Sequence, residues 1–237
     1  MYSVQCLGVG RGATNFLNGD PSTAYILKKD GTPVLFLDMG AGVGRSAAAL
    51  LDDNLPKTLY ISHNHSDHTG DLPVFIAKHR GQPITLLGHK NILSIVREHR
   101  LHELPSVGVS PDQDVNYVPG DLSSPIQYED LEFHMLRSDH AYECYGFVLK
   151  MSDVPILGWT ADSCFDTQIY EAVSQAPIAI AHGRDRPSGD HAAFDEIDAF
   201  AGTAPNTHFY VAHYGNTEST FSEPNVSLLK IGQEIRL

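Results

Sequence analysis

Short apolar runs alternate along the chain with stretches that have helical periodicity. Strand-type runs bounded by turn residues lie at Tyr2–Leu7, Thr23–Leu27, Val34–Leu37, Thr58–Ile61, Ile84–Leu87, Leu131–Leu136, Gly146–Lys150, Pro155–Trp159, Ile178–Ala181 and Phe209–Ala212. Helices are predicted at Val43–Leu51, Leu72–Arg80, Asn91–Leu104, Phe165–Ser174 and Ala192–Ala201. Because strands and helices alternate in both halves, the pattern predicts an α/β fold.

The same pattern predicts one domain over residues 1–237. No repeat, low-complexity segment or Pro/Gly/Ser-rich linker interrupts the 237 residues, and one α/β domain of this length is common. The first residues lack the basic start and apolar run of a signal peptide. No run approaches the ~20 apolar residues of a membrane helix. We therefore expect a cytoplasmic protein.

Charge and cysteine content narrow the classes of function. The formal net charge is -13, which disfavours long nucleic acid as a partner, although Lys90, Arg97 and Arg100 form a modest basic cluster. The 3 cysteines form no CxxC pair, so neither a disulfide framework nor a thiolate zinc site is indicated. Histidine is more informative, with 13 residues. We expect six of them on the surface: His79, His89, His99, His102, His134 and His208.

The segment Ser62–Gly70 carries the strongest chemical signal. It reads Ser-His-Asn-His-Ser-Asp-His-Thr-Gly and directly follows the predicted strand Thr58–Ile61. His63 and His65 are two residues apart, so both can point to one side of an extended backbone, and Asp67 and His68 follow after a turn. Imidazole and carboxylate suit zinc, manganese or iron. The segment therefore predicts a metal site at a strand end.

An HxHxDH motif after a strand resembles the signature of the metallo-β-lactamase superfamily, and the resemblance extends over nearly the whole chain. It implies a four-layer αββα sandwich, with two mixed sheets flanked by helices. The segment Leu37-Asp38-Met39-Gly40 looks like the end of the superfamily's N-terminal strands. By this resemblance Asp38 supports the metal loop and is not itself a ligand.

Three later positions match the remaining ligands of this family. His140 lies in a Ser-Asp-His context similar to the tRNase Z branch, Asp162 follows an apolar strand, and His213 ends another. The resemblance implies two divalent metal ions, zinc with manganese as the other choice. One ion would bind His63, His65 and His140, the other Asp67, His68 and His213, and Asp162 would lie between them.

The resemblance also implies catalytic roles. Two metal ions would activate a bridging hydroxide for attack at phosphorus or at a carbonyl. Asp67 would be a catalytic residue as well as a ligand, and His191, before a predicted helix, would protonate the leaving group. His182 occupies the place where the tRNase Z branch has a Glu that orients the catalytic histidine, and Asp190 or Asp185 are alternatives for that task.

Two departures from the tRNase Z branch indicate a small substrate. Between His140 and Asp162, 22 positions apart, there is room for a hairpin but not for the arm that grips tRNA, and Tyr214-Gly215-Asn216 lacks the usual Ser and Arg. The chain thus resembles short phosphodiesterases that hydrolyse cyclic nucleotides, such as the phage anti-Pycsar enzymes. Relatives of this branch form homodimers, so a homodimer is expected. The loops 11–20 and 105–114 are expected to line the nucleotide pocket.

Three alternatives stay open. The first is an endonuclease that matures tRNA 3′ ends with another surface. The second is a lactone or thioester hydrolase on the same two metal ions. The third is a metal-bearing scaffold or nucleotide sensor without catalytic activity.

Overall fold

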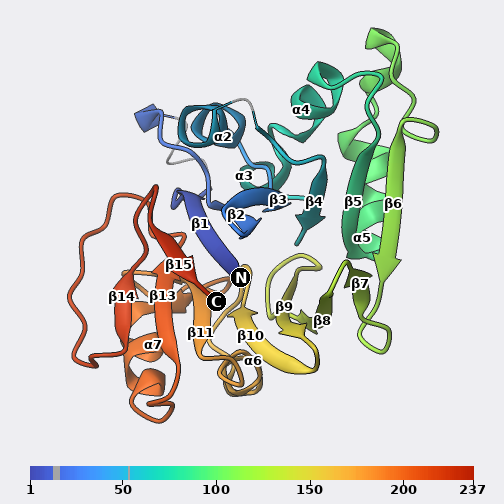
Figure 1. Cartoon of the computed structure of the whole chain (residues 1–237). Helices are drawn as coiled ribbons and strands as arrows, with labels where there is room; N and C mark the ends of the chain where they lie inside the picture. Colours follow the sequence, from blue (N-terminus) through green and yellow to red (C-terminus); the bar gives the residue numbers. More distant parts are fainter. Residues whose placement is uncertain (13–16, 53) are drawn as a thin grey trace. The chain divides into compact units, whose positions relative to one another are not determined.

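The chain divides into two compact units, each built on one mixed sheet (Figure 1). The computed structural model describes residues 1–12, 17–52 and 54–237. The first unit comprises Met1–Gly120 and Lys230–Arg236, and the second comprises Asp121–Leu229 with Leu237. The C-terminal segment therefore returns to the first unit. That the whole chain acts as one domain stays a prediction.

The sheet of the first unit is antiparallel on one side and parallel on the other. Its strands are β1 (Tyr2–Gly8), β2 (Ala24–Lys29), β3 (Thr32–Leu37), β4 (Thr58–Ile61), β5 (Ile84–His89), β6 (Val115–Gly120) and β15 (Glu234–Arg236). Their order is β15-β1-β2-β3-β4-β5-β6. The pairs from β3 to β6 are parallel, so the carboxyl ends of these strands meet at one edge.

Short helices connect these strands. They are α2 (Val43–Leu51), α3 (Ser66–Thr69), α4 (Leu72–Lys78), α5 (Lys90–Ile95), the π-helix η1 (Val96–Arg100) and the 3₁₀-helix η2 (Leu104–Val107). Helix α2 packs on β1, and α5 packs on β5 and β6. Each buries its apolar side, for example Val43, Ala47 and Leu51 of α2. The predicted helix over residues 91–104 thus ends as an α-helix at Ile95 and continues as a π-helix.

The sheet of the second unit has the same division into parallel and antiparallel parts. Its strands are β7 (Ile126–Tyr128), β8 (Leu131–Arg137), β9 (Tyr145–Met151), β10 (Val154–Trp159), β11 (Ile178–Arg184), β12 (Ala192–Ala193), β13 (His208–Ala212) and β14 (Val226–Leu228). Their order is β14-β13-β11-β10-β9-β8-β7, with β12 paired to β11. The helices α6 (Thr167–Val173) and α7 (Phe194–Ala201) pack on β9–β10 and on β11–β13 respectively.

Strand direction brings four chain segments of the second unit to one edge. Strands β10, β11 and β13 are mutually parallel, and β8 runs in the direction of β10 because both pair antiparallel with β9. The residues that follow these strands are His140, Asp162 and His213, and Arg184 is the last residue of β11. Sheet topology alone therefore gathers the chemistry-bearing residues of this unit.

Two details differ from the prediction. The helix expected over residues 192–201 begins at Phe194, because Ala192 and Ala193 pair with β11 as the short strand β12. Strand β11 extends to Arg184, so His182 lies inside the strand and not after it. Within the described ranges of the chain, no helix has the length and apolar character needed to cross a membrane.

Candidate metal centre

In the first unit, the predicted metal loop follows β4 and folds into the short helix α3. The rings of His63 and His65 lie 4.6 Å apart between centroids, and those of His63 and His68 lie 4.2 Å apart. The Nε2 atom of His68 is 3.7 Å from Oδ2 of Asp67. The four residues predicted from the HxHxDH motif thus form one group in this unit.

Asp38 orients this group through buried hydrogen bonds. It follows β3, which is parallel to β4, and its side chain is fully buried. Its Oδ1 accepts the backbone N–H of Ser62 at 2.8 Å, and its Oδ2 accepts the Ser62 hydroxyl at 2.6 Å. The same Oδ2 lies 2.7 Å from Nδ1 of His68. Asp38 therefore orients the loop, as the resemblance implied, and is not placed as a ligand.

These hydrogen bonds set the tautomers of the histidines. Ser62 donates its hydroxyl to Asp38, so its oxygen accepts from His63, whose Nδ1 lies 3.0 Å away. His68 likewise donates from Nδ1 to Asp38. In both rings the proton is on Nδ1, and the lone pair is on Nε2, the arrangement in which an imidazole binds a metal ion.

Two further contacts brace the metal loop. Arg100, the last residue of η1, donates to the side-chain oxygen of Asn64 at 3.1 Å and to its carbonyl at 2.8 Å. The backbone N–H of Gly12 donates to Oδ2 of Asp67 at 2.7 Å. A Cβ atom at Gly40 would collide with the carbonyl of Asp67, so this close approach requires glycine. The loop is therefore fixed from three separate segments.

In the second unit, three imidazoles surround one carboxylate oxygen. Oδ2 of Asp162 lies 4.0 Å from Nε2 of His140, 3.9 Å from Nε2 of His191 and 3.7 Å from Nε2 of His213. These separations are too long for hydrogen bonds. For His140 and His213 they suit atoms that each share a cation with Asp162, since two ligands each ~2.1 Å from one ion lie roughly 3–4 Å apart. His140 donates from Nδ1 to the carbonyl of Asp190 at 3.1 Å, so its lone pair is on Nε2.

His182 supports Asp162. Its Nε2 accepts from the indole N–H of Trp159 at 3.0 Å, so its proton is on Nδ1, which donates to Oδ1 of Asp162 at 2.7 Å. His182, Trp159 and Asp162 are all buried. The chain Trp159–His182–Asp162 fixes one carboxylate oxygen and leaves the other facing the imidazoles.

The surroundings of His191 differ from the expectation. His182 makes its hydrogen bonds to Trp159 and Asp162, and in the described part of the chain Nδ1 of His191 has no hydrogen-bond partner. Neither His182 nor Asp190 thus makes a hydrogen bond to Nδ1 of His191, and the role of either residue in orienting His191 stays a prediction. Instead Nη2 of Arg184 lies 2.6 Å from Nε2 of His191. Burial lowers the pKa of His191 to about 4, the nearby Asp162 carboxylate opposes this shift, and the Arg184 cation adds to it.

Three residues at these groups have a strained backbone conformation. Asp38, Ala161 and His213 have φ values of 63°, 51° and 64°, in the left-handed region that non-glycine residues seldom adopt. Ala161 directly precedes Asp162. Such conformations cost free energy and persist where the surrounding structure enforces them, typically at functional sites.

Histidines and basic residues outside the two groups have structural contacts. Two histidines expected on the surface, His79 and His89, are buried: His79 contacts Phe75, and His89 accepts the N–H of Asn91 at the start of α5. Their prediction as surface residues is wrong. Arg97 pairs with Asp112 at 2.6 Å, and Arg100 binds the metal loop. The basic cluster is therefore largely engaged within the chain.

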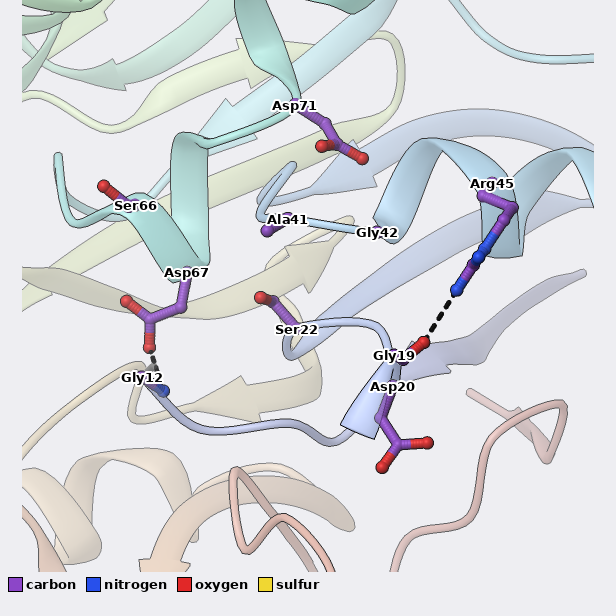
Figure 2. Close-up of a pocket in the computed structure, with 10 residues that line it drawn as sticks. All are labelled: Gly12, Gly19, Asp20, Ser22, Ala41, Gly42, Arg45, Ser66, Asp67 and Asp71. Atoms are coloured by element: carbon purple, nitrogen blue, oxygen red, sulfur yellow. Dashed lines mark hydrogen bonds between the residues drawn. The ribbon is translucent and has the colours of Figure 1, made fainter. Parts of the chain in front are cut away.

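A cavity of about 700 Å³ in the first unit adjoins the metal loop (Figure 2). Its lining includes Gly12, Gly19 and Asp20 from the loop that was expected to line a pocket, together with Asp67 of the metal loop. Figure 2 shows Gly12 beneath the carboxylate of Asp67, and the Arg45 side chain reaching the carbonyl of Gly19, 2.7 Å away. Residues 13–16 of that loop lie outside the described residues.

Sequence reasoning missed several of these residues. Arg184, Trp159 and Ser62 contact the predicted ligands or their neighbours, but the sequence assigned none of them a role, although Ser62 begins the segment that was singled out. A signal existed for Arg184, which lies two residues after His182 at the end of an apolar run. Ser62 directly precedes His63, yet its role depends on Asp38, which is distant in sequence.

Comparison with known proteins identifies the fold. YhfI from Bacillus subtilis, a metallo-β-lactamase fold protein, matches with a TM-score of 0.77 at 16% identity over 100% of both chains. A diphosphatase of the PhnP family matches with a TM-score of 0.73 at 13% identity, over 100% of this chain and 98% of the other. The short form of human tRNase Z matches with a TM-score of 0.70 at 17% identity, over 99% and 98%. The predicted metallo-β-lactamase fold class is confirmed.

A match to a family model identifies the family of the chain. No curated protein matches the chain in a sequence search. A family model described as Anti-Pycsar protein Apyc1 matches residues 2–234, which is nearly the whole chain. The chain carries histidine and aspartate groups able to hold a metal ion. The chain is therefore a metal-dependent hydrolase with a metallo-β-lactamase fold, and it belongs to the Anti-Pycsar protein Apyc1 family.

Proposed function

We propose that the chain is a phosphodiesterase with two divalent metal ions that hydrolyses a small phosphodiester, most simply a cyclic nucleotide. The ligands in this proposal are His63, His65, His140 and Asp162 for one ion, and Asp67, His68, Asp162 and His213 for the other. Zinc is the proposed metal, with manganese as the alternative, because imidazole and carboxylate donors suit both.

The observation that carries the proposal is the arrangement of donors around Asp162. One of its oxygens is held by His182, and the other faces three Nε2 atoms at distances of 3.7–4.0 Å. In the first unit, hydrogen bonds to Ser62 and Asp38 put the lone pairs of His63 and His68 on Nε2, the atom that would bind a metal ion. Fixed tautomers and a carboxylate with one anchored oxygen fit a site that is prepared for metal ions.

The metal ions would supply an activated water and neutralise charge that develops on the phosphoryl oxygens. The chain's own residues hold this arrangement without water competing for the ligands, since His63, His68, Asp162 and His213 are all buried. His191 lies beside the ligand atoms, where its Nε2, once protonated, can donate a proton to a leaving oxygen. Its proposed role is that of the general acid.

A small substrate is supported by the segment between His140 and Asp162. This segment consists of the antiparallel strands β9 and β10 joined at Ser152 and Asp153. It holds no arm that could grip RNA. The net charge of -13 also opposes binding of a long polyanion. The family description, which names an anti-Pycsar protein, further supports a cyclic nucleotide as the substrate.

The test is a turnover screen of 3′,5′-cyclic nucleotides, 2′,3′-cyclic nucleotides and linear dinucleotides, with zinc or manganese. We expect a cyclic nucleotide to be hydrolysed, EDTA to abolish turnover, and added metal to restore it. Asp162→Ala should lose turnover, whereas Asp166→Ala, at the start of α6, should keep it. Full activity after dialysis against excess EDTA would contradict the proposal.

Two rival activities are decided by adding a tRNA precursor and a panel of lactones and thioesters to this screen. A tRNA precursor cleaved at its 3′ end, with binding that weakens steeply as salt rises, would favour the endonuclease. Hydrolysis of lactones or thioesters without any phosphodiester turnover would favour a carbonyl hydrolase. The homodimer stays a prediction, and light scattering of the purified protein in solution measures it directly.

A further inference from the structure

Arg184 reaches the centre of the histidine group in the second unit, although no motif marked it. It ends β11, which is parallel to β10 and β13, so it lies at the same sheet edge as Asp162 and His213. Its Nη2 is 2.6 Å from Nε2 of His191 and 3.4 Å from Nε2 of His213. The guanidinium therefore lies where the proposed ligand atoms converge.

The hydrogen bond between Arg184 and His191 has a fixed direction. A guanidinium carries N–H donors only, so Nε2 of His191 is the acceptor and its proton is on Nδ1. The rings of His191 and His213 stack at 4.8 Å between centroids, which places both Nε2 atoms within reach of one guanidinium. In this state Arg184 is hydrogen-bonded to Nε2 of His191, the ring atom that would face a substrate.

The chemistry of arginine indicates what it would bind. The planar guanidinium keeps its charge at all working pH values and matches phosphate oxygens with paired donors. The two neutral imidazoles among its partners are weaker acceptors than an anion. A phosphodiester entering the site would therefore compete successfully for these donors.

We propose that Arg184 is a substrate-binding residue whose guanidinium leaves His191 and His213 to hold the non-bridging phosphoryl oxygens. Its departure opens Nε2 of His191 toward the substrate. This inference rests on the proposed function, because it assigns the anion-binding group of that same site.

The experiment compares zinc-loaded wild type with Arg184→Ala, Arg184→Lys and the control Arg186→Ala. Arg186 is two residues further along, is exposed, and lies 4.0 Å from Asp185. Binding of inorganic phosphate is measured by calorimetry, and zinc content by mass spectrometry. We expect Arg184→Ala to weaken phosphate binding about 10- to 100-fold at unchanged zinc content, as for loss of charged hydrogen bonds. The phosphate affinity of Arg184→Lys should lie between those of wild type and Arg184→Ala, and that of Arg186→Ala should equal the wild-type value.

Kinetics provide a second readout. With bis-p-nitrophenyl phosphate, Arg184→Ala should raise KM, and added guanidinium ion should partly restore the lost activity. Wild-type phosphate affinity in Arg184→Ala would overturn the inference. Loss of both zinc content and phosphate binding in this variant would also overturn it, because it would indicate that Arg184 has a structural role. If wild type hydrolyses no phosphodiester but phosphate binding still depends on Arg184, the proposed function fails while Arg184 stands as an anion-binding residue.

Discussion

At the scale of single residues, the proposed metal site is organised by side chains outside the proposed ligand set. Asp38 joins the backbone of Ser62, the hydroxyl of Ser62 and the ring of His68 through two oxygens. In the second unit, His182 does the same for Asp162. Each such group fixes a tautomer or a carboxylate orientation before any ion is bound, which lowers the entropy lost on metal binding.

Replacing Asp38 by Asn tests this role. Asn tolerates the left-handed backbone at this position, so the fold should persist. Its amide NH₂ would face a donor, either Ser62 or His68, and one of those contacts must break. We expect zinc affinity, measured by competition with a chromophoric chelator, to fall about 10- to 100-fold.

The matched control for this variant is Asp30→Asn. Asp30 also has a positive φ of 50°, but it is exposed and pairs with the N-terminal amine. Its substitution should leave zinc affinity unchanged. Equal affinities in the two variants would mean that Asp38 does not tune the site.

At the scale of elements, irregular backbone positions the metal loop. The helix after β5 changes at Val96 from α to π and ends at Arg100, whose guanidinium then reaches Asn64 inside the loop. A π-helical turn is rare and is found frequently at functional sites. Burial lowers the pKa of Arg100, as expected for a guanidinium held against the protein interior.

Arg100→Ala should therefore loosen the loop. We expect zinc affinity to fall about tenfold, because the loop must then be ordered at the cost of binding free energy. Turnover at saturating zinc should change less than affinity. Arg97→Ala is the control on the same π-helix, since its pair with Asp112 is exposed and such pairs contribute little. A loss of affinity of the same size in Arg97→Ala would assign the effect to the helix as a whole.

At the scale of the whole molecule, the proposed ligands come from both units and several are buried, so metal binding and folding should be coupled if the proposal holds. A ligand that binds the folded chain and not the unfolded one stabilises it by RT ln(1 + [L]/Kd), about 2.7 kcal/mol at one hundred times Kd. Zinc should therefore raise the Tm by several degrees, and EDTA should lower it. Calorimetric scans of wild type and Asp162→Ala measure this, and a zinc-dependent shift of the same size in Asp162→Ala would contradict the assignment of Asp162 as a ligand.

The order of elements followed from the sequence with few errors, because apolar periodicity directly reflects which face of an element is buried. Helix α2 and strand β4 have the predicted bounds, and the other predicted strands differ by one to three residues. The short strands β12, β14 and β15 were not predicted. The π-turn at Val96 was not predicted, because the local sequence of a π-helix resembles that of an α-helix. His79 and His89 were misplaced because burial of an isolated histidine depends on neighbours from other segments.

The sequence by itself determined the metal-binding motif after β4, since four ligand-type residues within six positions are local information. It also located His140, Asp162 and His213, but through a family resemblance and not from their own spacing. The tertiary structure decided which groups contact these residues. Asp38 is hydrogen-bonded to His68, His182 links Trp159 to Asp162, and Arg184 is hydrogen-bonded to His191. The reason is physical, because a hydrogen bond's direction and a ring's tautomer depend on atoms brought together by parallel strands that are far apart in the chain.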